Sequence, residues 1–373
     1  MTEQWRSVTR LERADFYADW LAASQQNELA TSNSPVVARG RDLTWVETEQ
    51  DHRIAMLIGP QVGFPSSGTN LCKAIIPAGH HTGHHRHGEE AIHIVGGSGF
   101  IMVDGRRYDF RGGTTIHVPY SSDHQLFNTG TDDVVYITAS SMDLDLFVRL
   151  GRLEQIGPKG ANAPDFDKAS PAEDGQLDTL GRRIALHLED APDEQKRREE
   201  IRAAERLAAG NDPAAVTGHE GRDNGHEGHA HGEEKKSTRH KSENPHRHGA
   251  IYILMGGGES PSPERNGFTA VSVAMTNIFE EVPHTSSHLH SHTEAVLYVL
   301  EGVGFSEIDS EHYDWEAGDA VHVPPKMTRH EHFNPSDQRT RTLRIEFGIR
   351  YFYEPLWSGY EKVEHRETAI ARP

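Results

Sequence analysis

The chain repeats one strand-rich pattern twice, and this repeat restricts its fold more than any other feature. VDGRRYDF at 103–110 aligns with IDSEHYDW at 308–315, an offset of 205 residues, and the same offset aligns the two HVP segments that start at residues 117 and 322. A fixed period of this kind indicates a repeated structural unit. Around both copies, short apolar runs are broken by Gly, Pro, Asn and Asp, which is typical of the strands of a barrel or sandwich. The sequence therefore predicts an all-β protein with two related domains.

The repeat divides the chain into four segments. We expect an N-terminal helical arm over 1–50, a first barrel over 51–157, a linker over 158–249 and a second barrel over 250–373. Apolar residues at helical spacing in 11–31 predict an amphipathic helix whose apolar face needs a partner. In the linker, Pro192 should begin a charged helix over 192–209. The His-rich tract over 211–248 has almost no apolar residues, so we expect it to be disordered.

Charge and composition exclude several classes of protein. The 38 Lys and Arg against 57 Asp and Glu give a net charge of −19, which repels nucleic acids and anionic membrane surfaces. No apolar run approaches the ~18 residues of a membrane span. Because Cys72 is the single cysteine and the first residues lack a secretory signal, we expect a cytoplasmic protein that binds neither nucleic acid nor membranes.

Histidines occupy matching positions in the two copies. Each copy has an H-x-H motif just before its main apolar run, starting at residues 85 and 290. Residues i and i+2 of a strand face the same side, so both imidazoles can bind one metal ion while Arg86 points away. A further histidine follows in each copy, four residues before an Asn. The candidate metal ligands are therefore His85, His87 and His124 in the first barrel and His290, His292 and His330 in the second.

Two alternatives remain open at these sites. In the second barrel, His288 and His290 form another possible pair. In the first barrel, Glu90 is a possible fourth ligand. Three neutral imidazoles leave coordination positions for a substrate or O2 at a metal such as Fe(II), Mn(II), Co(II), Ni(II) or Zn(II), and a carboxylate ligand would occupy one of them.

Both blocks resemble the cupin barrel, a double-stranded β-helix or jelly roll, and a chain with two of them is a bicupin. The two cupin motifs are matched in the first block by Gly79, His85, His87, Glu90 and Gly97 and by Gly113, Pro119, His124 and Asn128. The block departs from the pattern in having one residue fewer between His87 and Glu90, and in Ser121, which replaces a Gly. In the second block, Ala295 stands where the first has Glu90.

Among bicupins, the chain is similar to the gentisate 1,2-dioxygenase group, which includes salicylate and 1-hydroxy-2-naphthoate dioxygenases. The resemblance lies in HRH at 85–87 followed by Ala91 and Ile92, in RHEHFN at 329–334 and in the segment 53–79. It implies ferrous iron held by three histidines, usually of the N-terminal barrel, that cleaves aromatic rings with O2. It also implies a homo-oligomer. Members of the group lack the cupin glutamate at the metal, whereas this chain has Glu90.

These observations lead to three hypotheses about function. The first is a non-haem Fe(II) ring-cleaving dioxygenase for a hydroxylated aromatic carboxylate, with iron bound by His85, His87 and His124. The second is a redox-neutral decarboxylase or isomerase with Mn(II) and Glu90 as fourth ligand, and the third is a non-catalytic metal- or ligand-binding bicupin. A carboxylate substrate would need a cation in the cavity, and the candidates are Arg106, Arg107 and Arg344.

Three further histidines stand apart from the candidate ligands. His93 shares the strand face of Ala91, so it should face outward or pack between sheets. His117 and His322 repeat in register, which indicates a structural place in the fold as much as a site.

Overall fold

A computed structural model of the chain describes most of the two predicted barrels and part of what joins them. The described residues are 15–151, 153–164, 166, 171, 175–194, 196–197, 200, 203–204, 248–255, 266–287, 289–325 and 328–347. His288, nearly all of the His-rich tract and much of the predicted charged helix lie outside them.

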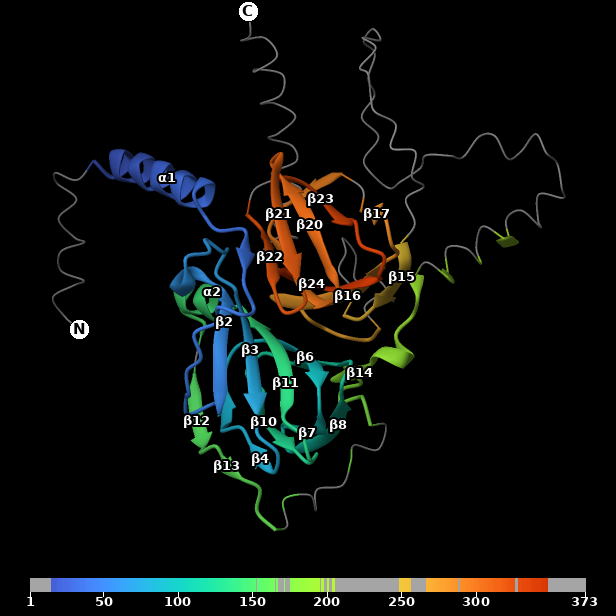
Figure 1. The fold of residues 1–373 in the computed structure, drawn as a ribbon. Helices are drawn as coiled ribbons and strands as arrows, with labels where there is room; N and C mark the ends of the chain where they lie inside the picture. Colours follow the sequence, from blue (N-terminus) through green and yellow to red (C-terminus); the bar gives the residue numbers. More distant parts are fainter. Residues whose placement is uncertain are drawn as a thin grey trace, which may run out of the picture.

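Each barrel consists of two antiparallel sheets, and the two barrels lie one above the other (Figure 1). The larger sheet of barrel 1 has the order β14 (Ala185–His187), β9 (Thr114–Val118), β6 (Glu90–Gly96), β11 (Val134–Ser140), β3 (Asn70–Ile76) and β2 (Arg53–Ile58). Its other sheet has the order β12 (Glu154–Gly157), β5 (His84–Arg86), β10 (Asp123–Asn128), β4 (His80–His81) and β13 (Gly160–Ala161), and β7 (Ser98–Val103) pairs with β10 and β8 (Arg106–Arg111).

Barrel 2 repeats this arrangement. Its larger sheet has the order β1 (Val37–Ala38), β22 (Ala320–Val323), β19 (Ala295–Glu301), β24 (Thr340–Phe347), β16 (Val273–Glu281) and β15 (His248–Ile253). Its other sheet has the order β17 (Thr285–Ser286), β23 (Thr328–Asn334), β20 (Val303–Ile308) and β21 (Glu311–Glu316), and β18 (His290–His292) pairs with β23. The predicted all-β fold with two related barrels is confirmed.

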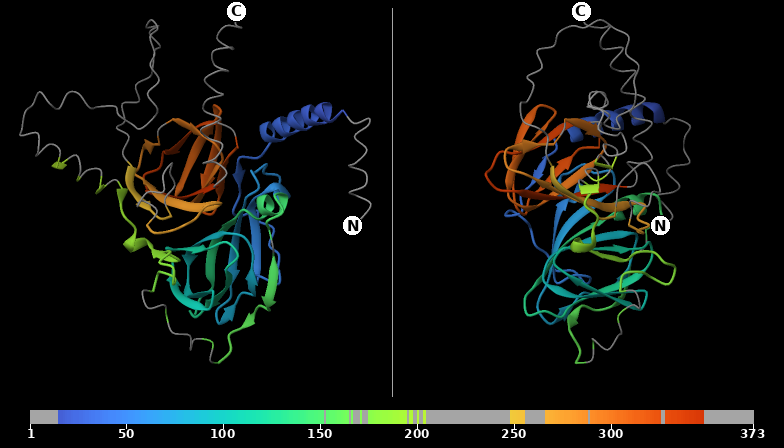
Figure 2. Two further views of the ribbon diagram at one scale, coloured as in Figure 1. Left: turned by 180° about the vertical axis from the view of Figure 1, so that it is seen from behind. Right: turned by 90° about the vertical axis from the view of Figure 1, so that its right-hand side faces the viewer.

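The larger sheets of the two barrels pack against each other and share a core (Figure 2). On β6, Ile92 and Ile94 point into barrel 1, whereas Ala91 packs in a cluster that also contains Val296 and Tyr298 of β19. These strands are therefore buried on both faces. This explains why their sequences are continuous apolar runs rather than alternating ones.

The predicted arm and linker each supply a strand to a barrel. β1 comes from the arm and pairs with β22 of barrel 2, and β14 comes from the linker and pairs with β9 of barrel 1. β9 and β22 hold corresponding positions in the repeat, so both barrels are completed in the same way. Part of each predicted connector therefore belongs to the folded domains.

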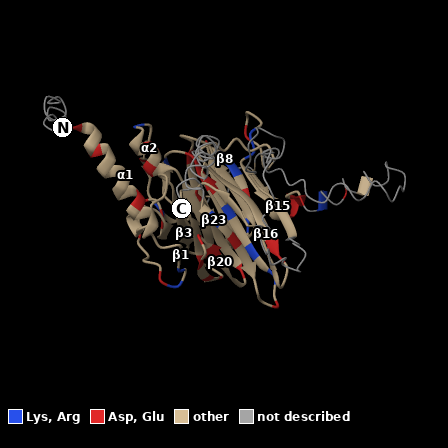
Figure 3. Cartoon of the chain, turned by 90° about the horizontal axis from the view of Figure 1, so that it is seen from above, with Lys and Arg blue, Asp and Glu red and all other residues tan. Residues whose placement is uncertain are grey.

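The N-terminal arm contains the predicted helix, but its apolar residues do not pack on the described part of this chain. α1 (Phe16–Ser32) begins after Asp15, whose Oδ1 accepts a hydrogen bond from the Ala18 amide at 3.0 Å. α1 projects from the barrels (Figure 3) and buries no residue. Its exposed apolar side chains include Phe16, Tyr17, Trp20, Leu21 and Leu29. The partner expected for its apolar residues is therefore not found among the described residues of this chain.

Three short helical elements are described in full. They are α2 (Met142–Phe147), η2 (Pro60–Val62) and η4 (Leu188–Asp190), and residues 194, 196–197, 200 and 203–204 of the predicted charged helix are also helical. Within the described residues, no helix is long and apolar enough to cross a membrane.

His93 is buried between sheets, which is one of its two predicted positions. Only 2% of the residue is exposed, and its Nδ1 lies 2.9 Å from Thr115 Oγ1. Burial lowers the pKa of the imidazole to about 4 from its ordinary value of 6.5. Between these two pH values, the unfolded chain binds a proton at this residue and the folded chain does not.

We predict that His93 makes the protein less stable as the pH falls from about 6.5 to about 4. The expected loss from this residue is about 2 kcal/mol of unfolding free energy between pH 7 and pH 5. His93→Asn keeps a polar atom near Thr115 but cannot titrate. In this variant, the part of the pH dependence of the unfolding free energy that His93 causes should vanish. Urea unfolding at several pH values measures it, and equal slopes for both proteins would contradict the prediction.

Candidate metal centres

The three predicted histidines of barrel 1 come together because of strand register. His85 on β5 lies directly opposite His124 on β10, and His87 follows β5 on the same side. Directly opposed residues of an antiparallel pair are the closest neighbours across a sheet. The possible ligand atoms of the three residues lie within 4.8 Å of one another.

Backbone carbonyls orient all three imidazoles toward a common centre. In each ring, Nδ1 lies at hydrogen-bond distance from a carbonyl oxygen: Gly83 O at 2.9 Å from His85, Gly88 O at 3.0 Å from His87 and Ser122 O at 3.3 Å from His124. A carbonyl can only accept, so Nδ1 carries the proton and Nε2 keeps its lone pair. This arrangement of outer partners is the one that metal-binding histidines use.

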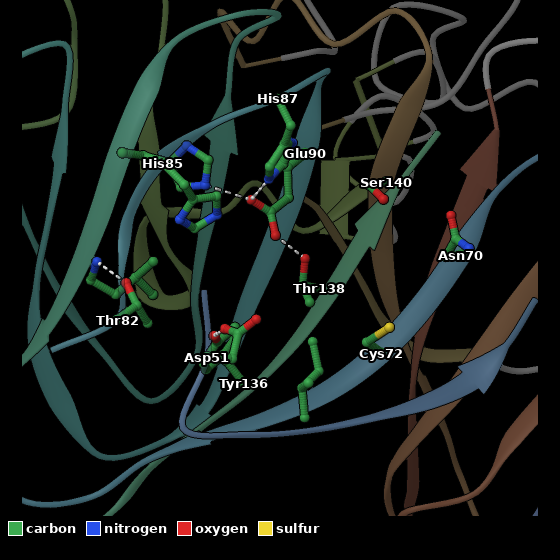
Figure 4. A pocket seen from close by; sticks show the side chains of 13 residues that line it. Asp51, Asn70, Cys72, Thr82, His85, His87, Glu90, Tyr136, Thr138 and Ser140 are labelled. Atoms are coloured by element: carbon green, nitrogen blue, oxygen red, sulfur yellow. Dashed lines mark hydrogen bonds and ion pairs between the residues drawn. The ribbon is translucent and has the colours of Figure 1, made fainter. Parts of the chain in front are cut away.

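Glu90 belongs to the same cluster. Its Oε2 lies 3.2 Å from His124 Nε2 and 3.5 Å from His87 Nε2, and its Oε1 accepts a hydrogen bond from the Thr138 hydroxyl (Figure 4). Burial alone would raise the pKa of Glu90, but the His124 and His87 imidazoles hold it well below its usual value. The shortened loop thus leaves the carboxylate facing the histidines.

The donor set fits a divalent cation. Glu90 Oε2 and His124 Nε2 are both buried, and neither has a hydrogen-bond partner in the described part of the chain. Buried polar atoms without partners are costly, and a cation between them would satisfy both. With His85 and His87, they form a set of three imidazoles and one carboxylate.

The cavity beside this centre is small and polar. It has a volume of about 110 Å³, and the Tyr136 hydroxyl donates a hydrogen bond to Asp51 Oδ1 at 2.6 Å on its wall. Burial and the nearby Asp51 and Glu90 carboxylates raise the pKa of the Cys72 thiol to about 12, so this group stays protonated. Among the described residues that line the cavity, none is Lys or Arg.

Barrel 2 builds a corresponding cluster from β18 and β23. His290 lies opposite His330, and the possible ligand atoms of His290, His292 and His330 lie within 4.8 Å of one another. His292 Nδ1 lies 2.6 Å from Thr293 O, and His330 Nδ1 lies 2.8 Å from Thr328 O. The Nε2 atoms of His292 and His330 are 3.0 Å apart, which again leaves two lone pairs facing one centre.

The two clusters differ in charge at matching positions. Thr138 pairs with Ile92 across β11 and β6, and Arg344 pairs with Leu297 across β24 and β19, so Arg344 stands where barrel 1 has Thr138. Ala295 stands where barrel 1 has Glu90. Barrel 2 thus replaces the carboxylate by a methyl group and the hydroxyl by a guanidinium, which is 2.7 Å from the buried Glu346 carboxylate.

The cavity of barrel 2 is larger and more apolar. Its volume is about 220 Å³, and its lining includes Phe279, Leu297, Trp315, Val323 and Phe333 together with His290, His292, His332 and Arg344. Of the three arginines considered from the sequence, only Arg344 lines either cavity. Arg106 is exposed, and Arg107 lies 4.3 Å from the Phe100 ring centre and pairs with Asp109.

His332 is a cavity residue that sequence reasoning missed. Its Nδ1 lies 2.7 Å from Ser306 Oγ, which also accepts a hydrogen bond from Trp315 Nε1 at 3.0 Å. Burial and the neighbouring His330 lower the pKa of His332 well below its usual value, so the ring is neutral. A sequence signal for His332 was available, because His330 and His332 form an H-x-H motif on β23, in addition to the one that starts at residue 290.

Other predicted positions are also accounted for. Arg86 points away from the metal cluster, as expected, and pairs with Asp123 at 3.1 Å and Glu154 at 3.4 Å. His117 and His322 are fully buried and lie outside both clusters.

Comparisons with known proteins agree with this architecture. The Cupin domain family matches residues 73–140 and 278–346. Salicylate 1,2-dioxygenase from Pseudoaminobacter salicylatoxidans, solved as an adduct with gentisate, superposes with a TM-score of 0.52 at 15% identity and covers 90% of this chain and 81% of its own. A mutant of Bacillus subtilis oxalate decarboxylase gives 0.54 at 12% identity, with 84% and 77% covered.

One curated sequence is related over a shorter stretch. An uncharacterized protein of Methanocaldococcus jannaschii is 29% identical over 85 residues, which are 22% of this chain and 67% of that protein. The two domain matches, the duplicated barrels and the duplicated histidine clusters lead to one conclusion. The chain has two cupin domains and is therefore a bicupin, with a fold similar to that of salicylate 1,2-dioxygenase.

Proposed function

We propose that this bicupin is a non-haem Fe(II) dioxygenase that cleaves the ring of a hydroxylated aromatic carboxylate with O2, and that the reaction takes place in barrel 2. The observation that carries the proposal is the exchange at matching positions, where Ala295 and Arg344 replace Glu90 and Thr138. Without the carboxylate, more coordination positions stay open for substrate and O2. The sequence alone favoured barrel 1 as the site of iron and of the reaction. In that barrel, however, Glu90 faces the histidines.

The residues around the barrel 2 cluster suit such a substrate. The Arg344 guanidinium can form a bidentate pair with an aromatic carboxylate. The Phe279, Trp315 and Phe333 side chains can contact the ring and keep water out. Bound iron would supply the activation of O2 and a binding site for the substrate oxygens. The likeness to salicylate 1,2-dioxygenase is consistent with this reaction class.

Barrel 1 supports a second candidate function, a redox-neutral reaction such as decarboxylation or isomerisation with Mn(II) or another divalent metal. Glu90 adds a carboxylate oxygen to the imidazoles of His85, His87 and His124, and carboxylate ligands suit Mn(II).

The proposal includes a cytoplasmic location and a homo-oligomer. The exposed apolar side chains at the start of α1 are suited to contacts between subunits.

The first test locates the reaction. Protein reconstituted anaerobically with Fe(II) should consume O2 with gentisate, salicylate or 1-hydroxy-2-naphthoate and bleach the aromatic absorbance. His292→Ala should abolish this uptake because it removes a barrel 2 ligand, while His87→Ala should retain it. The exposed His312, which pairs with Asp314, provides the control His312→Ala. Loss of uptake in His87→Ala alone would return the reaction to barrel 1, and no uptake by iron-loaded protein would reject the dioxygenase.

The second test concerns the substrate carboxylate. Arg344→Lys keeps the positive charge opposite Glu346 but loses the planar fork, so KM for an active carboxylate should rise about tenfold with a smaller change in kcat. Arg341→Lys, on the same strand but paired with Glu280 and Glu301, is the matched control. Steady-state oxygen uptake measures both constants. An unchanged KM in Arg344→Lys would show that the carboxylate binds elsewhere.

The third test concerns Glu90. If the carboxylate binds the metal in barrel 1, Glu90→Gln should weaken Mn(II) binding there by about 10- to 100-fold, since it replaces a charged donor by a neutral one. Manganese titration followed by electron paramagnetic resonance, in a His292→Ala background, isolates this site. Glu154→Gln changes an exposed carboxylate that pairs with Arg86 and is the control. Equal Mn(II) affinity of the two variants would leave barrel 1 with three ligands.

A further inference from the structure

Two buried carboxylates occupy matching positions next to the two metal clusters. Glu89 accepts a hydrogen bond from His117 Nε2 at 2.7 Å, and Glu294 accepts one from His322 Nε2 at 2.8 Å. The two glutamates are 4% and 1% exposed, respectively. His117 and His322 are the two histidines that repeat in register in the sequence. Neither pair belongs to the metal clusters described above.

Each of these carboxylates is bound by the opposite barrel. Glu89 of barrel 1 accepts hydrogen bonds from the Val271 amide at 2.9 Å, from the Ser272 amide and from Ser272 Oγ at 2.8 Å, just before β16 of barrel 2. Glu294 of barrel 2 accepts hydrogen bonds from the Ser67 amide at 2.7 Å and from Ser67 Oγ, just before β3 of barrel 1. The contacts are reciprocal, so each barrel anchors one carboxylate of the other.

The anchored glutamates are joined directly to groups that orient a metal ligand. The carbonyl of Gly88, the residue before Glu89, receives the Nδ1 proton of His87. The carbonyl of Thr293, the residue before Glu294, receives the Nδ1 proton of His292. A carboxylate held in place therefore fixes the peptide that sets the direction of Nε2. Outer partners of this kind control how tightly a metal is bound.

We infer that Glu89 and Glu294 are positioning residues, and that each barrel controls the metal affinity of the other through the serine that binds its glutamate. The inference rests on metal binding by both histidine clusters, as in the proposed function. A serine in barrel 1 thus acts on the metal of barrel 2, and a serine in barrel 2 acts on the metal of barrel 1. A contact that only stabilised the interface would affect both metals alike.

The test is a crossed substitution with Co(II) as the probe. Ser67→Ala should weaken Co(II) binding in barrel 2 about threefold, because one hydrogen bond to Glu294 is lost, and leave barrel 1 unchanged. Ser272→Ala should do the reverse. Glu294→Gln should weaken barrel 2 about tenfold. Visible absorption of Co(II) reports each site when the other is emptied by His87→Ala or His292→Ala in the full chain.

The controls separate this inference from folding defects and from the proposed function. Ser66→Ala removes a hydroxyl whose partner, Thr69 O, is in its own barrel, so both affinities should stay unchanged. Ser67→Thr restores the hydroxyl and should restore affinity. Equal weakening of both sites by Ser67→Ala, or weakening of barrel 1 alone, would overturn the inference. If the unsubstituted protein bound no Co(II) in either barrel, the metal centres themselves would be rejected.

Discussion

The burial of both faces of β6 and β19 is the constraint on which the rest of the structure depends. These strands lie between a barrel interior and the partner barrel, so residues of alternate parity enter two different environments. Glu89 and Glu90 show the effect most clearly. They are neighbours in sequence, yet Glu90 faces the histidines of barrel 1 while Glu89 reaches Ser272 of barrel 2. One peptide bond thus links the metal centre to the interface between the barrels.

The same alternation explains why the histidines could be found from sequence. An H-x-H motif places both imidazoles on one strand face, and the repeat showed it twice with a third histidine at nearly the same distance. Strand register then brings His85 opposite His124 and His290 opposite His330. Only the H-x-H pair is close along the chain, and the third histidine, which lies across the β5–β10 or β18–β23 pairing, was found because the repeat keeps its spacing. The two clusters needed no knowledge of how the barrels pack.

Other features depend on contacts that no local pattern encodes. Arg344 enters the barrel 2 cavity from β24, and only the pairing of β24 with β19 shows that it stands where barrel 1 has Thr138. β1 and β14 are too short to have a recognisable strand pattern, and they pair with strands far along the chain. The sequence did not predict which way the Glu90 side chain points, because the loop before it is one residue short. That direction depends on contacts with Thr138 and the histidine pair and on the anchoring of Glu89.

Duplication followed by exchange of a few inward residues accounts for two centres of different character in one fold. At matching positions, barrel 1 has Glu90 and Thr138 and barrel 2 has Ala295 and Arg344, so a carboxylate is lost and a guanidinium paired with Glu346 is gained while the histidines are retained. The interface pairs of Glu89 with His117 and Glu294 with His322 did not change in this way. The glutamate–histidine pairs at the interface are therefore the same in both halves, whereas the cavity residues beside the histidines differ. This contrast separates the shared framework from the positions that set the chemistry of each barrel.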